Sequence, residues 1–445
     1  MKFRGHIRTS NVRYFTRYYR LVLLSVAVAM TVIVGSLMIG DSVRGTLRAQ
    51  VDERLGESQS IIFARESYLD ESILDPLPEA EGYLLMQGFI SHNGMLHPVM
   101  VWGCQMEGDA AFINEPLAKE LGEEEMENLV LRLPSAGMVP SGSLFVTDNY
   151  TTSLRLKVAG VRSSEEGGNM NLRTEQVQPF NIFLPRHVLA EAMEVDAKIN
   201  LILSPRLISE DELLAVWQPH HSGLVIKQMP QYVEATSSRI FLQEHVVDRF
   251  CSSDKNANRL YSYLANGIAS ERDTIPYSFV TALDSYAGIE LGAGEVILSD
   301  YSARRLGAKV GDNVKISYFK AEELKRLSTI EREFKVRAIL PLEQLHADEH
   351  LSAEFPGLSD VERCTEWDSD LPLDMDLIED EDEAYWEHYR QTPKALIAYS
   401  SVIDDWQSDY GTATALRLSS MPDLTALQPD MFGVEIMHPR EDAIY

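Results

Sequence analysis

The hydrophobic positions of this chain begin as one unbroken run. Leu21 to Gly40 holds twenty residues without a charge, the length that an α-helix needs to cross about 30 Å of hydrocarbon. The run is rich in Leu, Ile and Val, which favour insertion into a bilayer. We therefore expect a transmembrane helix over residues 21–40. A cleaved signal peptide is the rival interpretation, but its apolar region should be only about 7–15 residues long, and Ser36-Leu37-Met38 is a poor cleavage site.

The charges on the two sides of this run are unequal. Residues 1–20 carry six basic residues and no acid, whereas residues 41–445 carry 34 Lys and Arg and all 68 acids. By the positive-inside rule, the N-terminus stays in the cytoplasm and residues 41–445 are extracytoplasmic. The six basic residues are Lys2, Arg4, Arg8, Arg13, Arg17 and Arg20.

Beyond the apolar run, hydrophobic residues recur at every fourth position from Val43 to Leu55. This spacing places them in one stripe along a helix, and Gly56 is placed to cap its C-terminal end. We predict a stalk helix that leaves the bilayer. The partner of its stripe could be another chain or a surface of its own domain. The candidate stalk residues are Asp41, Ser42, Val43, Leu47, Val51 and Leu55.

From residue 59 onward, short apolar runs alternate with turn residues, which is typical of strands. Asn93-Gly94 lies between apolar runs at 83–91 and 95–102, and this is a strong hairpin signal because both turn residues need a positive φ. Residues 237–265 predict a helical connection instead. The fold class expected is α+β, in which helices pack on a mixed sheet.

Six stretches recur in the same order later in the chain, at an offset that drifts between about 185 and about 215 residues. The first match pairs Tyr83–Phe89 with Tyr277–Leu283, and the last pairs Ile199–Leu203 with Thr414–Leu418. This order predicts a duplicated extracytoplasmic module with insertions. The expected divisions are a basic segment (1–20), the transmembrane helix (21–40), a stalk (41–58), a first α+β half (59–235), a second α+β half (236–430) and the start of a return stalk (431–445).

Composition narrows the classes of function. The chain has 445 residues, of which 45% are hydrophobic, and a net charge of −28. Such a length predicts about two to three domains. The acidic outer part argues against nucleic acid or an anionic membrane surface as its partner. Cys104, Cys251 and Cys364 are too few and too dispersed for a disulfide framework or a zinc site; two could pair, and buried free thiols fit equally well.

The chain lacks the common catalytic motifs, including the P-loop, the Gly-x-Ser-x-Gly elbow and His-Glu-x-x-His. His346, Glu349 and His350 do match the inverted zincin pattern, whose imidazoles would share one helix face. That stretch lies between a strand and Pro356 and has no apolar period, so a polar loop is favoured. We therefore expect no catalytic residue, no cofactor, no metal ligand and no enzymatic activity.

An acidic stretch, Glu366 to Glu387, is the remaining candidate. Asp368, Asp370, Asp374 and Asp376 alternate with other residues, as calcium ligands often do. An EF-hand beginning at Asp368 would need glycine where Leu373 stands. A solvated acidic lid or a surface for a partner is the favoured interpretation.

Five stretches resemble one family of membrane proteins. They are Ile39–Leu47, Pro276–Val280, Arg305–Asp312, Phe355–Asp360 and Tyr385–Ala395. The first resembles the end of the first transmembrane helix of the FtsX-like permeases of ABC transporters, the group that includes MacB and the lipoprotein-release permeases. The others resemble the MacB-like extracytoplasmic core of the long members.

The resemblance implies a permease subunit in the cell inner membrane that dimerises and works with a separate cytoplasmic ABC ATPase. Its stalk would couple ATP hydrolysis to movement of the outer domain, for export or release of a substrate. Further membrane helices would follow the domain, so an N-terminal fragment is expected. The alternatives are a single-pass anchored binding or scaffold protein, and an anchored hydrolase that uses His346, Glu349 and His350.

Overall fold

The computed structural model describes residues 14–65, 67–92, 94–122, 129–134, 151–172, 179–322, 326–355, 357–367, 371–408 and 410–439, and at positions 47, 48, 50, 51, 151, 321, 322 and 326 it describes the backbone alone. Several residues that the sequence singled out lie outside this part of the chain. They are Lys2, Arg4, Arg8, Arg13, Asn93, Pro356, Asp368, Asp370 and residues 440–445.

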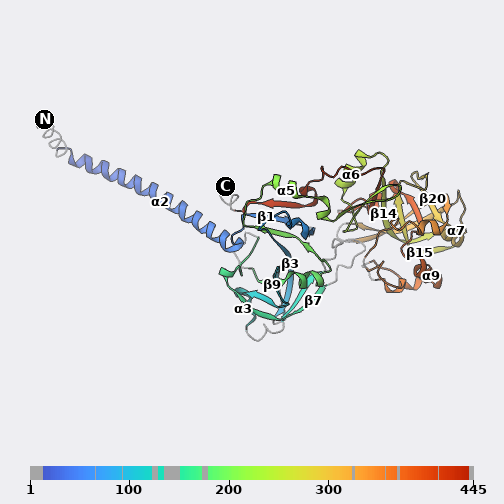
Figure 1. Ribbon diagram of the computed structural model, residues 1–445, viewed down its shortest axis with the longest axis horizontal. Helices are drawn as coiled ribbons and strands as arrows, with labels where there is room; N and C mark the ends of the chain where they lie inside the picture. The colour runs from blue at the N-terminus through green and yellow to red at the C-terminus, as the bar shows by residue number, and fades with distance from the viewer. Residues whose placement is uncertain are drawn as a thin grey trace.

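One helix, α2 (Thr16–Leu55), contains both the predicted membrane span and the predicted stalk. Its 40 residues make it about 60 Å long. Residues 16–46 are long and apolar enough to cross a membrane, and no residue of their most apolar 18-residue stretch is buried by the described part of the chain. Figure 1 shows the helix projecting away from the rest of the molecule. It ends where expected, because Gly56 takes φ +57° and its N–H donates to Asp52 O at 2.9 Å.

The outer part is mixed α/β and contains two large sheets. The first sheet has the strand order β23-β1-β11-β3-β4-β9-β5-β8, and β6 pairs with β3 and β7. The predicted hairpin is confirmed as β3–β4, with Gly94 at φ +77°. The elements of this part are β1 (Ser60–Ala64), β2 (Leu69–Asp70), β3 (Glu81–His92), β4 (Met95–Cys104), β5 (Ala111–Asn114), α3 (Glu115–Leu121), β6 (Leu129–Pro134), β7 (Thr151–Leu156), β8 (Val158–Arg162), β9 (Asn181–Pro185), α4 (Arg186–Ala192), β10 (Lys198–Ile199), β11 (Leu201–Ser204), α5 (Glu210–Val216) and β23 (Val434–Met437).

The second sheet has the order β12-β13-β22-β14-β15-β21-β18-β20-β19, and β14 also pairs with β19. A long connection between β20 and β21 carries α8 and α9. The elements are β12 (Leu224–Gln228), β13 (Val233–Ser237), α6 (Glu244–Ser253), β14 (Asn258–Ala269), β15 (Thr274–Leu283), β16 (Ser285–Tyr286), β17 (Ile289–Glu290), β18 (Glu295–Ser299), α7 (Asp300–Leu306), β19 (Asn313–Glu322), β20 (Arg326–Leu340), α8 (Leu342–His346), α9 (Asp380–Tyr389), β21 (Ala395–Ala398), α10 (Ile403–Trp406) and β22 (Ala415–Leu418).

The two sheets share one order of pairings. In the first, β4 pairs parallel with β9, β9 antiparallel with β5, and β5 parallel with β8; β15, β21, β18 and β20 repeat this series in the second. Even the register shift recurs, between Ala111 and Phe112 and between Val296 and Ile297. One predicted match is wrong, because Tyr277–Leu283 lies in β15, which pairs as β4 does, whereas Tyr83–Phe89 lies in β3.

A shared core joins the two sheets. Ile62 and Ile202 of the first sheet pack in one cluster with Ala235 and Leu416 of the second. The helical prediction for residues 237–265 is wrong beyond α6, because residues 258–269 form β14. That strand is buried on both faces over Leu260–Ala265, so it lacks the alternation that identifies a half-exposed strand.

The last strand of the chain returns to the first sheet. β23 pairs antiparallel with β1, so that Met437 lies opposite Ile61 and Val434 opposite Ala64. An ion pair of 3.0 Å between Arg65 and Glu435 joins the same two segments. The red strand therefore lies beside the blue β1 in Figure 1. The last residue of β23, Met437, therefore lies near the point where α2 joins the domain.

A carboxylate fixes α10 to β19 and β20 of the second sheet. Asp405 accepts hydrogen bonds from Tyr318 (2.7 Å), Lys320 (2.7 Å) and Arg332 (2.6 Å). Burial raises the pKa of the Asp405 carboxyl, but these hydrogen bonds outweigh burial and lower its pKa to about 2.

Candidate functional site at the base of the membrane helix

The six predicted stalk residues do not share one environment. Asp41, Ser42 and Val43 lie on the part of α2 that projects from the molecule, where Val43 is 53% exposed. Leu47 and Val51 lie in the helix, but their side chains are outside the described part of the structure. Leu55 is 8% exposed and packs on the outer domain. Only this last residue of the stripe has a described partner within the chain.

Leu55 is held by one face of the first sheet. It packs in a cluster with Leu85 of β3, Trp102 of β4, Phe183 of β9 and Leu203 of β11. Burying a leucine side chain stabilises a contact by about 1.5–3 kcal/mol. The last turn of the helix is therefore part of the packed domain.

Three hydrogen bonds from one loop lie beside this apolar contact. Glu53 Oε1 accepts from Asn169 Nδ2 at 2.7 Å and from Ser164 Oγ at 3.0 Å. The backbone N–H of Asn171 donates to Arg54 O at 3.0 Å. Residues 163–172, which follow β8, thus hold the last turn of α2 from one side. We name this segment the receiving loop.

The receiving loop is tied to the sheet by Asn181, which is fully buried at the start of β9. Its Nδ2 donates to Gly168 O at 2.9 Å and to Met170 O at 2.8 Å, and its Oδ1 accepts from Trp102 Nε1 at 3.3 Å. A Cβ at position 168 would lie 2.4 Å from Arg162 O, so the loop requires glycine there. The sequence analysis did not identify these residues. The only local sign of a structured loop was Gly167-Gly168 followed by Asn169 and Asn171.

The junction offers no reactive nucleophile among its described residues. Burial raises the pKa of the Cys104 thiol to about 11, so the thiol stays protonated at neutral pH. Its Sγ lies 3.4 Å from Trp102 O and can donate to it.

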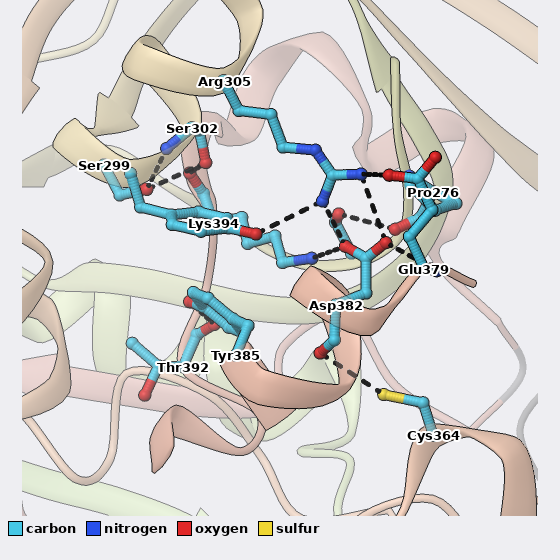
Figure 2. A network of polar contacts seen from close by, with 12 residues as sticks. Pro276, Ser299, Ser302, Arg305, Cys364, Glu379, Asp382, Tyr385, Thr392 and Lys394 are labelled. Carbon is cyan, nitrogen blue, oxygen red and sulfur yellow. Dashed lines mark hydrogen bonds and ion pairs between the residues drawn. The ribbon is translucent and has the colours of Figure 1, made fainter. Parts of the chain in front are cut away.

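A second polar centre lies in the other half and is buried. Asp382 of α9 accepts from Arg305 Nη1 at 2.6 Å and from Lys394 Nζ at 3.2 Å. Figure 2 shows the carboxylate between the two cations, with Glu379 at the outer end of Arg305. Burial lowers the pKa of Lys394, and Asp382 opposes this shift. Burial raises the pKa of the neighbouring Cys364 to about 12.

This centre fastens the acidic stretch to the sheet. Asp382 comes from α9, Arg305 from α7, and Lys394 directly precedes β21. The stretch 366–387 is therefore not wholly a solvated lid, since Asp382 is 4% exposed. The calcium interpretation has no support in the described part, where no group of three His, Cys, Asp or Glu side chains could hold a metal ion.

The inverted zincin residues point to separate partners. His346 ends α8, and its Nδ1 lies 2.8 Å from Thr392 Oγ1. His350 Nδ1 instead lies 3.5 Å from Glu234 Oε2. The helix ends at His346, so the motif does not place its two imidazoles on one helical face.

Comparison with known proteins gives a limited result. No family model matches the sequence, and no curated protein matches it. Among solved structures, the chain is similar to the periplasmic region of MacB from Actinobacillus actinomycetemcomitans, with a TM-score of 0.24 and 10% identity over 38% of this chain and 87% of that one.

Two further structures are similar at the same level. The extracellular domain of the ABC-type transporter YknZ from Gram-positive bacteria has a TM-score of 0.22 and 9% identity, over 37% of this chain and 90% of that one. A domain described as part of a permease protein from Porphyromonas gingivalis has a TM-score of 0.22 and 14% identity, over 49% of this chain and 89% of that one. These neighbours are domains of transport proteins, and each likeness spans less than half of this chain.

Proposed function

We propose that this chain is a permease subunit of an ABC transporter, anchored by α2 in the cell inner membrane with its N-terminus in the cytoplasm. A separate cytoplasmic ATPase would move α2, and the outer domain would change shape to export or release a substrate. In this proposal the chain is not an enzyme, and two copies of the permease subunit act together.

The continuity of α2 with the outer domain carries this proposal. Forty residues form one helix from the apolar span to Leu55, and the receiving loop is hydrogen-bonded to its last turn. A tilt or rotation of the membrane part would therefore reach the sheet without a flexible linker between them. Rigid-body movement of this kind requires no catalytic side chain.

The pairing orders of the two sheets support a further element of the proposal, that the outer domain arose by duplication. The return of β23 to β1 supports another, that residues 431–445 begin a return stalk. A segment that continues from Met437 would leave the domain beside α2, as a second stalk requires.

The experiment tests whether movement passes through α2. The full chain would be purified from its native membrane together with any ATPase that binds it, and reconstituted in proteoliposomes. Hydrogen exchange at the Asn171 amide, which donates to Arg54 O, should change when nucleotide is added. Leu47→Pro should abolish this change, because proline removes a helical hydrogen bond and kinks the helix. Leu47→Ala, which keeps the helix, should preserve it.

Two results would contradict the coupling role. One is a nucleotide response that survives Leu47→Pro. The other is a chain that binds no ATPase in its native membrane. The second result would favour a single-pass anchored binding or scaffold protein.

A further inference from the structure

One carboxylate of the second sheet is buried without a hydrogen bond. Glu234 lies in β13 and is 1% exposed, and neither of its carboxylate oxygens has a hydrogen-bond partner among the described residues. Two basic side chains lie near it. Arg417 Nε is 3.6 Å from Oε1, and His350 Nδ1 is 3.5 Å from Oε2. A buried carboxylate is costly unless neighbouring positive charges balance it.

The arginine beside Glu234 is already engaged by a second carboxylate. Arg417 of β22 lies opposite Glu234 in the strand pairing, but its Nη1 and Nη2 donate to the two oxygens of Asp348 at 2.9 and 2.7 Å. One guanidinium thus lies between two carboxylates. The cluster therefore lacks one positive charge, and His350 supplies it only when its imidazole is protonated.

The other polar groups around Glu234 do not supply this charge. Lys227 of β12 lies opposite Glu234 on its other side, but it is exposed and forms no ion pair within the described part of the chain. The ring of Tyr232 faces the Arg417 guanidinium at 4.5 Å. Burial raises the pKa of Tyr286 to about 12 and also raises that of Tyr232, so both phenols stay neutral near neutral pH.

The cluster joins two separate parts of the fold. Asp348 and His350 both follow α8 in the connection between β20 and β21, whereas their partners belong to strands of the sheet. We name residues 347–353 the docked segment. It is also attached through Ala353, whose backbone N–H donates to Ser262 Oγ of β14 at 2.8 Å. The charge balance of the cluster therefore contributes to holding the docked segment on the sheet.

We propose that Glu234 and His350 share one extra proton while the docked segment lies on the sheet, and that the segment is released more readily as the pH rises. When the segment opens, water solvates both groups. A solvated histidine loses its proton near about pH 6.5, and a solvated glutamic acid near about pH 4.3. The docked state therefore binds more protons than the open state near neutral pH, so a lower pH favours docking.

The burial of Glu234 acts in the same direction. Burial raises the pKa of its carboxyl, and the charges of His350 and Arg417 oppose this rise. A carboxyl whose pKa is raised in the docked state favours docking at low pH, and this contribution is lost as the pH rises through that pKa. The device is independent of the coupling role of α2.

The test measures hydrogen exchange at the Ala353 amide in the full-length chain in detergent, between about pH 5.5 and about pH 8.5. Each rate is divided by the intrinsic rate at that pH, because hydroxide itself accelerates exchange. The resulting protection should fall as the pH rises, by up to about tenfold per pH unit, which is the limit for one bound proton. The Asn171 amide in the first half is the internal reference and should show no such fall.

Two variants should remove the pH dependence by opposite changes of charge. Glu234→Gln removes the carboxylate that needs a cation, and His350→Lys supplies a cation that persists over the whole range. Both should keep the protection of the Ala353 amide at its low-pH level. The matched controls are Glu290→Gln and His388→Lys, which change exposed side chains in the same half and should leave the pH dependence within about twofold.

Three results would overturn the proposal. The first is protection that does not change with pH in the original chain. The second is a pH dependence that persists in either folded variant, since another group would then cause it. The third is its loss in a control variant as well, since the total charge would then be responsible. Thermal unfolding identifies any variant that does not fold. If Glu234→Gln fails to fold, His350→Lys decides alone, because the His350 side chain is 34% exposed.

Discussion

Removing the charge of Asp382 should destabilise the second half more than removing any exposed carboxylate. The change Asp382→Asn leaves Arg305 and Lys394 buried without the carboxylate that both contact. Breaking a buried ion pair by removing one partner costs about 3–5 kcal/mol. Glu379 still reaches Arg305 at 3.0 Å, but no other described carboxylate contacts Lys394. We therefore expect a loss within this range, a large share of the roughly 5–15 kcal/mol that holds a typical domain together.

The assay is unfolding of the full chain in detergent by urea and by heat. Trp386 lies on α9 and contacts Trp367 with ring centroids 5.1 Å apart, so tryptophan fluorescence reports on this region. A loss of 3–5 kcal/mol corresponds to a Tm lower by about 6–20 °C for a unit of some 200 residues. The control Glu379→Gln should cost less than about 1 kcal/mol, because that side chain is 71% exposed.

A triple variant tests the physical reason. Arg305→Met, Asp382→Leu and Lys394→Met together replace the charges by apolar groups, and such replacements are often neutral or stabilising. The triple variant should recover most of the stability that Asp382→Asn loses. If Asp382→Asn cost no more than Glu379→Gln, the cluster would contribute nothing as an ion pair and this reasoning would be refuted.

Three further predictions concern the contacts of Leu55, the glycine of the receiving loop and the carboxylate of Asp405. Leu55→Ala should raise hydrogen exchange at the Asn171 amide and cost about 2–5 kcal/mol, whereas Val43→Ala on the exposed helix should do neither; equal effects would exclude docking through Leu55. Gly168→Ala should loosen the same amide, because its Cβ would meet Arg162 O at 2.4 Å; unchanged exchange would show that the loop adapts. The pKa of Asp405 is lowered to about 2, so the stability it contributes is present above about pH 4 and lost as the pH falls toward 2. Asp405→Asn should flatten the Tm–pH curve in that window, and an unchanged slope would refute this.

The sequence predicted what depends on local chemistry. The apolar run, the apolar residues at every fourth position and Gly56 together predicted α2 and its end. Helix length, the spacing of apolar residues and helix capping all depend on residues that are close together in the sequence. The hairpin at Gly94 was predicted for the same reason. Residues 258–269 were misread, since a strand buried on both faces shows no alternation.

The contacts that make the junction were beyond reach of the sequence. β1 and β23 are separated by some 370 residues of chain, and no local pattern specifies such a pairing. Asn181 carries no sign of its role until the receiving loop is folded over it.

The pairing of β1 with β23 has a mechanical consequence. The two strands run antiparallel, so the end of β1 that follows α2 lies beside Met437, the last residue of β23. If the two segments were pulled apart at this end, the hydrogen bonds between β1 and β23 would break one after another, beginning at the Ile61–Met437 pair. Breaking them in sequence requires less force than breaking them all at once. If both segments were pulled in the same direction, the force would act on the two strands together and their hydrogen bonds would stay intact. For the proposed transporter, this means that α2 and a return stalk after Met437 would have to move together for β1 and β23 to stay paired.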